Sequence, residues 1–489
     1  MGAHRGGLAI GSALLGLALL MSPAGVGRAG EELAENAKFV SPDGDDRAND
    51  GSLEKPWRTI RHAVDRGTAG VTVYVRAGVY SEVVRINQKY GNPEKVFTLQ
   101  NYPGERPVID LNYEEQYAII VASRYATVRG FEIRRLKGDP TYRYSMGAIQ
   151  VLDDCRHVTI ENNLVHDIVG GRKAARGISV AENCDGVLIR NNTVHHITGH
   201  PESTGIHVDG SFNVAIRRNL VYFVDKEGIR LITQDTDTDN VIEENIVLHC
   251  HYGIAINHAR TSKQIVARNN FCAWNWGRGM NPKHCRNVLV EHNDFIGSGE
   301  FGYDSHGNGT LDGDVVYLTL KNNLFSQNCT EWWLDEREVL YETVDYNFYH
   351  HTGAEPLAAF NWNAADKCYT LKDIREKTRD KGSLNGPYES NGREGDPGFV
   401  APEKWDYRLK PDSAARGAAD DGKEVGVIEG TLVEVGADKA YGLGNIPDLG
   451  WLAYTIESVS SETEKGPAEN LLKNFKTLYW EIDAAKDAR

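Results

Sequence analysis

The sequence of 489 residues is short of basic charge and of methionine. It carries 54 lysines and arginines against 69 aspartates and glutamates, which gives a formal net charge of -15. Nucleic-acid-binding proteins normally present a basic face, so this balance argues against a nucleic-acid partner. Only four methionines accompany 50 glycines, a composition typical of a chain that turns often rather than one built of long amphipathic helices. The length suffices for one large elongated domain and a smaller appendage.

Long apolar runs are also missing, apart from one near the N-terminus. His4 and Arg5 precede an apolar run over residues 8–21, and residues 27–29 supply small side chains suited to a signal peptidase. We therefore predict a signal peptide at residues 1–29, with an uncleaved membrane anchor as the alternative. No later segment is long and apolar enough to span a bilayer. The mature protein is expected in the periplasm, at the cell surface or secreted, without a membrane span and as a monomer.

Cysteines are few and odd in number. The seven are Cys155, Cys184, Cys250, Cys272, Cys285, Cys329 and Cys368. In an exported chain they permit disulfides but form no dense framework, and no spacing among them suggests zinc. Cys155 and Cys184 occupy matching places in neighbouring repeats, which favours two stacked apolar side chains over a bridge.

The sequence is rich in one repeated phrase, a short β-rich run, an asparagine and a second short run. The aligned asparagines are Asn163, Asn192, Asn219, Asn245, Asn270, Asn293 and Asn323, spaced by 29, 27, 26, 25, 23 and 30 residues, with Gly130 at the same place in an earlier repeat. A second phrase follows each asparagine: RGISV (176–180), TGIHV (204–208), EGIRL (227–231), YGIAI (252–256), RGMNP (278–282) and FGYDS (301–305).

This spacing predicts a solenoid of coils. Apolar and polar residues alternate with period two, so each run is a strand with an inner and an outer face. Units of 23–30 residues are too short for a strand–helix–strand crossover and fit three short strands separated by bends. One such coil cannot bury its apolar face, whereas stacked coils form a continuous core. Asparagine tolerates the left-handed conformation of a sharp bend and can hydrogen-bond between coils, so the asparagine ladder is interpreted as structural.

Two other repeat architectures fit less well. A leucine-rich solenoid has a similar period but would show Leu-x-x-Leu-x-Leu before each asparagine, where this chain has valine and isoleucine. A β-propeller repeats at a longer period.

The segment over residues 39–84 (FVSPDGDD…KPWRTIRHAV…VTVYVRAGVYSEVV) resembles the N-terminal cap of extracellular pectate-lyase-like β-helix proteins. Its Trp57–Ala63 stretch is similar to the small helix that closes the first coil in that superfamily. The resemblance extends over about residues 39–425 and includes DYNFYH (345–350), GDPGF (395–399) and DYRLKPDSAARGAAD (406–420). It implies an all-β fold, a right-handed single-stranded parallel β-helix with an N-terminal cap helix, over residues 30–450.

The remaining stretch, residues 451–489, is interpreted as a C-terminal extension. Residues 455–485 resemble the opening of a discoidin-like (F5/8 type C) carbohydrate-binding module, with a Thr-x-x-Trp ending at Trp480. The chain after this point is too short for the whole module. An amphipathic C-terminal helix packed on the solenoid is the alternative.

Chemistry on a solenoid comes from side chains that point outward from one stack of strands. Alternate residues along the Gly-Ile strands give one outward series, and the residues two places further on give a second. The polar members of the two series from the third coil onward are His207, Asp209, Arg230, Asn257, Asn281, Lys283, Asp304 and His306. Neighbouring strands lie about 4.8 Å apart, so these groups predict a polar surface long enough for several sugar rings. Asn257, Asn281, Tyr303 and Trp276 are the candidate substrate-binding residues, the two aromatic ones by stacking on sugars.

Lys283 is the candidate catalytic base. Lyases and C5 epimerases of uronic-acid polymers remove a proton alpha to a carboxylate, which needs a base and a cation that stabilises the resulting charge. Arg230 is the candidate clamp for the carboxylate because its planar fork binds two oxygens. His207, Asp304 and His306 are candidates to assist. These roles resemble those in the β-helix pectate lyases that combine a lysine with calcium.

Two alternative sites are open. Asp235, Asp237 and Asp239 alternate within one loop, one coil from Asp209, and their hard oxygens predict a Ca²⁺ site or else a plain acidic turn. FGYDSH (301–306) is similar to the Tyr-Gly-Phe-Asp-Pro-His signature of alginate C5 epimerases, but it has Phe301 in place of the catalytic tyrosine and Ser305 in place of proline. The histidines between residues 195 and 207 lack the spacing of a zinc motif.

We therefore predict an exported enzyme whose partner is a polysaccharide, a lyase that cleaves an acidic polysaccharide by β-elimination. The alternatives are a glycoside hydrolase with a carboxylate pair such as Asp209 and Asp304, a C5 epimerase, and a non-catalytic glycan-binding surface protein. The Asn-Thr-Asp, Asp-Asp, His-Gly and Arg-Ile-Lys signature of β-helix polygalacturonases is missing from the sequence.

Overall fold

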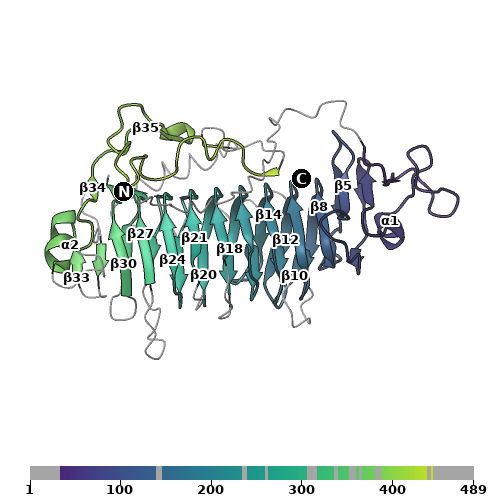
Figure 1. Ribbon diagram of the computed structural model, residues 1–489, viewed down its shortest axis with the longest axis horizontal. Coiled ribbons are helices and arrows are strands. Elements are labelled where there is room, and N and C mark those ends of the chain that lie inside the picture. Colours follow the sequence, from purple (N-terminus) through teal and green to yellow (C-terminus); the bar gives the residue numbers. More distant parts are fainter. Residues whose placement is uncertain are drawn as a thin grey trace, which may run out of the picture.

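The computed structural model describes residues 33–138, 146–233, 239–258, 263–305, 317–334, 340–351, 360–362, 366–379, 387–437 and 442–443. In these residues the chain winds as a rod of stacked coils, and each complete coil contributes one strand to each of three parallel ladders (Figure 1). The predicted parallel β-helix is therefore confirmed.

The first ladder is a 12-stranded sheet. Its strands are β1 (Ala37–Val40), β2 (Thr72–Val75), β5 (Phe97–Asn101), β8 (Arg124–Arg129), β11 (Arg156–Glu161), β14 (Leu188–Arg190), β17 (Ala215–Arg217), β19 (Val241–Glu243), β21 (Ile265–Arg268), β24 (Val288–Glu291), β27 (Tyr317–Lys321) and β30 (Leu340–Asp345).

The second ladder follows the bend that carries the asparagines. It contains β3 (Gly78–Tyr80), β6 (Pro107–Asp110), β9 (Glu132–Lys137), β12 (Leu164–Val169), β15 (Thr193–Thr198), the first halves of β18 (Leu220–Ile232) and β20 (Ile246–Asn257), β22 (Phe271–Ala273), β25 (Asp294–Ile296), β28 (Leu324–Ser326), β31 (Phe348–His350) and β34 (Arg393–Glu394).

The third ladder contains the Gly-Ile phrases. Its strands are β4 (Val84–Asn87), β7 (Ile119–Ala122), β10 (Met146–Val151), β13 (Ala175–Val180), β16 (Thr204–Asp209), the second halves of β18 and β20, β23 (Arg278–Lys283), β26 (Phe301–Asp304), β29 (Thr330–Leu334) and β32 (Phe360–Trp362), which pairs antiparallel with β33 (Asp366–Cys368). Because β18 and β20 run continuously through the bend, the second and third ladders join into one sheet.

The asparagine ladder is a buried chain of hydrogen bonds along the rod. The Oδ1 atom of Asn219 accepts bonds of 3.0 Å from both the backbone N–H and the side-chain amide of Asn192, one coil earlier. The side-chain amide of Asn219 also donates to the carbonyl of Ile189 at 3.0 Å. All seven ladder asparagines are fully buried, so each bond replaces one that water would otherwise make.

The left-handed residue of the bend lies one place before each ladder asparagine. Asn162, Asn191, Arg218, Glu244, Asn269, His292 and Asn322 have φ between 52° and 58°, whereas none of the ladder asparagines has a positive φ. The expectation that the ladder asparagines themselves adopt this conformation was therefore wrong. Gly130, with φ 79°, aligns with the left-handed residue, and Phe131 stands at the ladder position in its coil.

The ladder ends on a carboxyl group. Asn347 continues it past Asn323 and donates from its side-chain amide to Glu389 Oε1 at 2.7 Å, and Tyr349 donates to the same oxygen at 2.6 Å. Each ladder asparagine donates to the next asparagine toward the C-terminal end, so the last one requires another acceptor there. Burial raises the pKa of Glu389 to about 7, although the hydrogen bond from Tyr349 opposes this.

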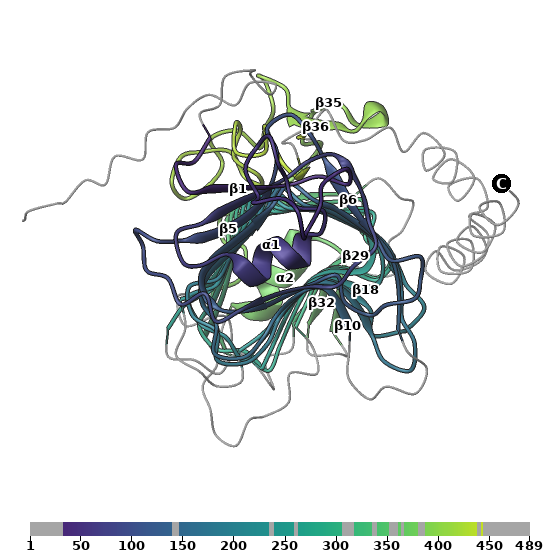
Figure 2. The same cartoon turned by 90° about the vertical axis from the view of Figure 1, so that its right-hand side faces the viewer.

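Helices close both ends of the rod. Helix α1 (Ile60–Arg66) begins after Thr59, whose hydroxyl accepts from the His62 N–H, and it covers the first coil with Ile60, Ala63 and Val64 (Figure 2). The predicted cap helix is confirmed, although it begins three residues after Trp57. Helix α2 (Leu371–Thr378) lies at the other end, held by a capping box of Thr370 and Asp373 (Figure 1).

Residues 396–437, which we call the strap, return along the outside of the rod (Figure 1). The strap contains β35 (Phe399–Ala401), a 3₁₀ turn (Pro402–Lys404) and β36 (Asp406–Leu409). Its apolar side chains pack on the outer face of the second ladder, including Leu248 and Phe271. It reaches Thr193, whose hydroxyl accepts from the Ala437 N–H at 2.9 Å. The strap covers a different side of the rod from the third ladder (Figure 2).

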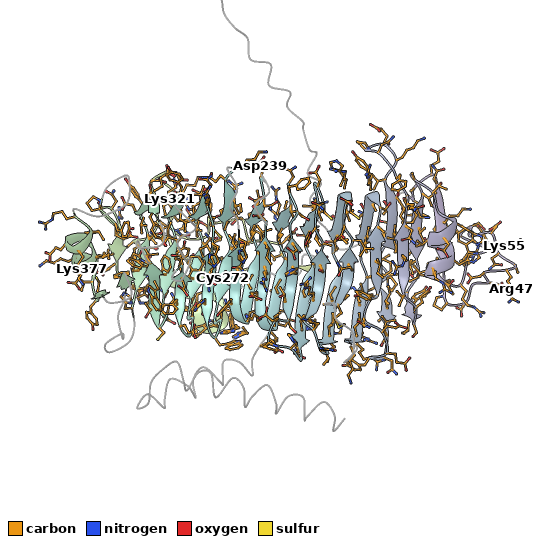
Figure 3. All side chains as sticks on the ribbon, turned by 90° about the horizontal axis from the view of Figure 1, so that it is seen from below. Arg47, Lys55, Asp239, Cys272, Lys321 and Lys377 are labelled. Atoms are coloured by element: carbon orange, nitrogen blue, oxygen red, sulfur yellow. The ribbon has the colours of Figure 1, made fainter. Side chains whose placement is uncertain are left out.

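All seven cysteines lie in the described residues, and no disulfide joins any of them. Cys155 and Cys184 are buried without a bridge, as the stacking interpretation predicts, and Cys272 lies within the rod (Figure 3). In the described part of the chain, no helix has the length and apolarity to cross a membrane.

Asp294 beneath the strap predicts a pH dependence of stability. Its Oδ1 atom accepts the Val427 N–H at 3.0 Å, and burial raises its pKa from 3.8 to about 7. A folded-state pKa above the unfolded value contributes stability that is complete below pH 3.8 and is lost as the pH rises through about 7. Asp294→Asn mimics the neutral acid. We therefore expect its free energy of unfolding to fall less steeply with pH than that of the original protein, by on the order of 1 kcal/mol per pH unit.

The measurement is urea unfolding between pH 4.5 and 8. Asp412→Asn, an exposed residue of the strap, is the control and should leave the profile unchanged. A parallel profile for Asp294→Asn and the original protein would contradict the assignment.

Candidate functional site

Three rows of side chains point outward from the third ladder, and together we call them the strip. The first row is Arg176, Thr204, Glu227, Tyr252, Arg278 and Phe301. The second row is Gln150, Ser179, His207, Arg230, Ala255, Asn281 and Asp304. The third row is Asp209, Ile232, Asn257 and Lys283.

The second and third rows have the register predicted from the repeat. Arg230 pairs with His207 and Ala255, and Lys283 pairs with Asn257. The residues between these two rows, such as Leu231 and Ile256, belong to the core. Lys283 and Arg230 therefore face outward on the same flank of the rod.

The sequence pattern did not reveal the first row because the alternation of inward and outward residues breaks at the glycine of each Gly-Ile phrase. A side chain on Gly177 would point inward, with its Cβ 2.4 Å from Val194 Cγ1, and the next residue, Ile178, also points inward. Because Gly177 and Ile178 both face inward, the preceding residue, Arg176, faces outward. The available signal was the residue directly before each glycine, which is charged in RGISV, EGIRL and RGMNP.

Arg230 is held by carboxylates of its own chain. Its Nη1 atom lies 3.4 Å from Glu202 Oε2 and 3.9 Å from Glu227 Oε1, and its side chain is 21% exposed. Lys226 pairs with the other oxygen of Glu202 at 2.9 Å. Burial raises the pKa of Glu227. Burial also acts to raise the pKa of Glu202, but Lys226 and Arg230 outweigh it and hold that pKa below its usual value.

His207 is buried and neutral. Only 2% of it is exposed, and burial, together with the charges of Arg176 and Arg230, lowers its pKa to about 4. Its Nε2 atom lies 3.9 Å from Asp209 Oδ2, too far for a hydrogen bond. Both ring nitrogens are buried without a hydrogen-bond partner among the described residues.

Asp304 is not available to a substrate. It is fully buried, and Arg278 Nε lies 2.7 Å from its Oδ2 atom. Arg278 in turn covers the ring of Tyr252 at 4.7 Å from its centroid. The predicted assisting role of Asp304 is therefore wrong, and we assign it to positioning Arg278.

Lys283 is partly exposed and has amides as neighbours. Asn257 is its partner in the adjacent coil, and the Oδ1 atom of Asn257 is buried without a hydrogen-bond partner in the described structure. Asn281, two residues earlier, donates to the Asp304 carbonyl at 2.6 Å. The rings of His258 and His284 stack beside the end of this strand, 5.1 Å apart.

Coil spacing decides which of these groups can act together. Asp209 and Asp304 are four strands apart, about 19 Å, whereas paired carboxylates of glycosidases lie about 5–9.5 Å apart. The predicted hydrolase pair is therefore wrong. Arg230 is two strands from Lys283, about 10 Å, and pairs with Glu202 on the side away from Lys283.

Of the two aromatic candidates for sugar stacking, one is buried and the other is partly exposed. Tyr303 is fully buried in the core, because the residue beside outward Asp304 must face inward, and its predicted contact with sugar is wrong. Trp276 is partly exposed and stacks on His251, with centroids 4.0 Å apart and planes 8° apart.

The acidic loop is described only at its edges. His306, Asp235 and Asp237 lie outside the described residues. Asp209 is 27% exposed on the strip, whereas Asp239 is 64% exposed, pairs with Lys263 at 3.2 Å and projects from the edge of the rod (Figure 3). Within the described ranges, no three His, Cys, Asp or Glu side chains gather as a metal site would require.

Comparison with known proteins agrees with this architecture. A family model described as "Pel9A-like, right handed beta helix region" matches residues 38–220, and one described as "Right handed beta helix region" matches residues 204–331. The crystal structure of pectate lyase Pel9A aligns with a TM-score of 0.52 at 13% identity, over 84% of this chain and 96% of that chain. The protein is a right-handed parallel β-helix.

Two curated relatives match parts of the β-helix. It is 31% identical over 147 residues to the uncharacterized protein YwoF of Bacillus subtilis, which is 29% of this chain and 31% of the relative. It is 41% identical over 73 residues to pectate lyase PEL9 of Emericella nidulans, which is 15% of this chain and 18% of the relative. The chain thus spans less than a third of the length of these relatives. The matches support the pectate-lyase-like superfamily, and they do not show the discoidin-like module expected at residues 455–485, which lies outside the described residues.

The ion pair between Arg278 and Asp304 predicts a structural effect. Asp304→Asn leaves a guanidinium that is 16% exposed with Glu300, 3.5 Å from Nε, as its remaining carboxylate, so we expect the β-helix to lose roughly 2 kcal/mol of stability. Urea unfolding measures the loss, with exposed Asp153→Asn as the control. Unchanged stability in Asp304→Asn would show that the pair does not support the strip.

Proposed function

We propose that the β-helix is an exported polysaccharide lyase that cleaves an acidic, uronic-acid-containing polysaccharide by β-elimination on the strip. The observation that carries the proposal is the outward position of Lys283 in register with Asn257, beside Asn281, on the flank that holds the other charged residues. The partial identity to a pectate lyase and the shared fold support a carbohydrate-active protein.

In this proposal Lys283 is the base. Its neutral amine removes the proton on the carbon next to the uronate carboxylate. The electron pair forms a carbon–carbon double bond, and the glycosidic oxygen leaves with its bonding pair and takes up a proton. The side-chain amide of Asn257 lies beside Lys283, where it can hold a sugar hydroxyl or carboxylate oxygen. Asn281 is buried and donates to the Asp304 carbonyl, so its predicted contact with substrate requires its second amide hydrogen.

The other candidate residues have supporting roles in this proposal. Arg230, neutralised by Glu202 and Glu227, contributes to the surface that a neighbouring part of the polymer would cross. Trp276 and His306 keep their proposed roles, in stacking and in acid–base assistance. A C5 epimerase would begin with the same proton removal, and a binding protein would hold the polymer without changing it.

Substitution of Lys283 tests the chemistry. We expect Lys283→Ala to lower the rate of formation of the unsaturated, ultraviolet-absorbing sugar end on pectate or alginate by at least about a hundredfold, because the base is lost. Lys137→Ala, an exposed lysine at the end of a second-ladder strand, is the matched control. Full activity in Lys283→Ala would remove it from the reaction, new reducing ends without ultraviolet absorption would indicate a hydrolase, and an altered uronate at an unbroken linkage would indicate an epimerase.

We extend the proposal to Ca²⁺, held by Asp209 together with Asp235, Asp237 and Asp239. Hard carboxylate oxygens suit this ion, and its charge would help to bind a polyanionic substrate. Asp209 fits such a site because its side chain is 27% exposed on the strip.

Chelation tests the ion. We expect EDTA to lower product formation at least about tenfold, Ca²⁺ to restore it, and Asp209→Asn to raise the Ca²⁺ concentration needed, because one ligand is lost. Mg²⁺ is the control, since it prefers a smaller and more rigid coordination shell. Activity that is indifferent to both EDTA and Ca²⁺ would remove the ion from the proposal.

A further inference from the structure

Arg176 differs from the other arginines of the strip. Arg230 and Arg278 each pair with carboxylates of the chain. Arg176 makes one hydrogen bond, from Nη1 to the hydroxyl of Ser179 at 3.2 Å, and no carboxylate lies within 4 Å of it among the described residues. Its Nε atom is buried without a hydrogen-bond partner in the described structure, as are those of Arg230 and Arg278, so the missing carboxylate is what sets Arg176 apart.

This arrangement costs stability. A buried charge that has no partner loses its hydration without compensation, which costs several kcal/mol unless a counter-charge is supplied. Burial lowers the pKa of Arg176 to about 10 although the more distant charges of Asp209 and Glu227 oppose it, so the guanidinium is still charged at neutral pH. A half-buried cation with one neutral partner is therefore suited to an anion that comes from outside the chain.

His207 gives a second, independent sign of a ligand at this place. It follows Ser179 in the second row, one coil later, and it is near enough for the charge of Arg176 to lower its pKa. Its two ring nitrogens are buried and unpartnered in the described structure. A neutral imidazole offers one donor and one acceptor, which is the complement of a sugar hydroxyl.

We propose that Arg176 and His207 form a subsite for one uronate residue of the polymer, with the carboxylate on Arg176 and a ring hydroxyl on His207. The planar guanidinium suits the two oxygens of a carboxylate. Arg176 lies four strands and His207 three strands from Lys283, about 19 and 14 Å along the rod, so the subsite holds a residue well away from the bond that is cleaved. This assignment rests on the proposed function only in taking an acidic polysaccharide as the ligand.

The test is binding of acidic glycans to the full-length protein, measured by calorimetry in a Lys283→Ala background so that no cleavage occurs. The probes are pectate, alginate, fully methyl-esterified pectin and dextran sulfate. We expect Arg176→Gln to weaken binding of pectate or alginate at least about tenfold and to leave binding of the methyl-esterified polymer unchanged, because only a free carboxylate uses the guanidinium. Arg190→Gln is the matched control, since Arg190 pairs with Glu161 on the first ladder, on another flank.

Two further readouts separate binding from structure. A structural arginine would leave Arg176→Gln less stable, whereas removal of an unpartnered charge should keep or raise the melting temperature. In the active protein, Arg176→Gln should raise KM for long polymers and leave kcat unchanged, because the subsite is remote from the cleaved bond.

The outcomes distinguish the two proposals. If the protein forms unsaturated product and Arg176→Gln binds pectate and alginate as tightly as its parent, the subsite is wrong and the lyase stands. If the protein binds pectate or alginate without cleaving it and Arg176→Gln loses that binding, the subsite stands and the lyase is wrong. Loss of dextran sulfate binding alone would replace the carboxylate by a sulfate ester and overturn the uronate assignment. Binding of none of these polymers would overturn both.

Discussion

In-register hydrogen bonding between parallel coils is the constraint on which the rest of this β-helix depends. Each coil is bonded through its backbone to the next, and the buried asparagines add a second set of bonds with the same spacing. A slip of one residue would turn the apolar side of a strand outward and break every amide bond of the ladder. Because each ladder asparagine donates to the next one toward the C-terminus, the ladder needs an acceptor at its end. Glu389, which follows the last ladder asparagine by 42 residues, supplies it.

The same register fixes the chemistry that the surface can perform. Side chains on one row are separated by whole strand spacings of about 4.8 Å, so only groups on the same or adjacent coils can act on one sugar. Asp209 and Asp304 are too far apart to act as a glycosidase pair. Lys283, Asn257 and Asn281 lie on adjacent coils, which is the arrangement that the proposed proton removal uses.

The outer faces of the second and third ladders differ in chemistry. On the second ladder, the strap covers apolar residues such as Leu248 and Phe271, which stabilises the fold. On the third ladder, the strip keeps charged and polar groups in place, and two of its arginines have carboxylate partners. Arg176 and His207 keep buried polar atoms unpartnered. Such local costs are found where a protein binds something else, and the long apolar core of the solenoid can offset them.

The sequence by itself determined the coil architecture, the asparagine ladder and the register of two outward rows, because inside–outside alternation is a local pattern repeated in every coil. It did not reveal the first row, since Gly177 and its counterparts place two consecutive residues inward. Only the tertiary structure showed that Asp304 is buried under Arg278 and that Arg230 is already paired. It also placed the strap, where Asp294 meets Val427 across 133 residues of chain. These features depend on which distant side chains meet and how much water they lose, and periodicity carries no information on either.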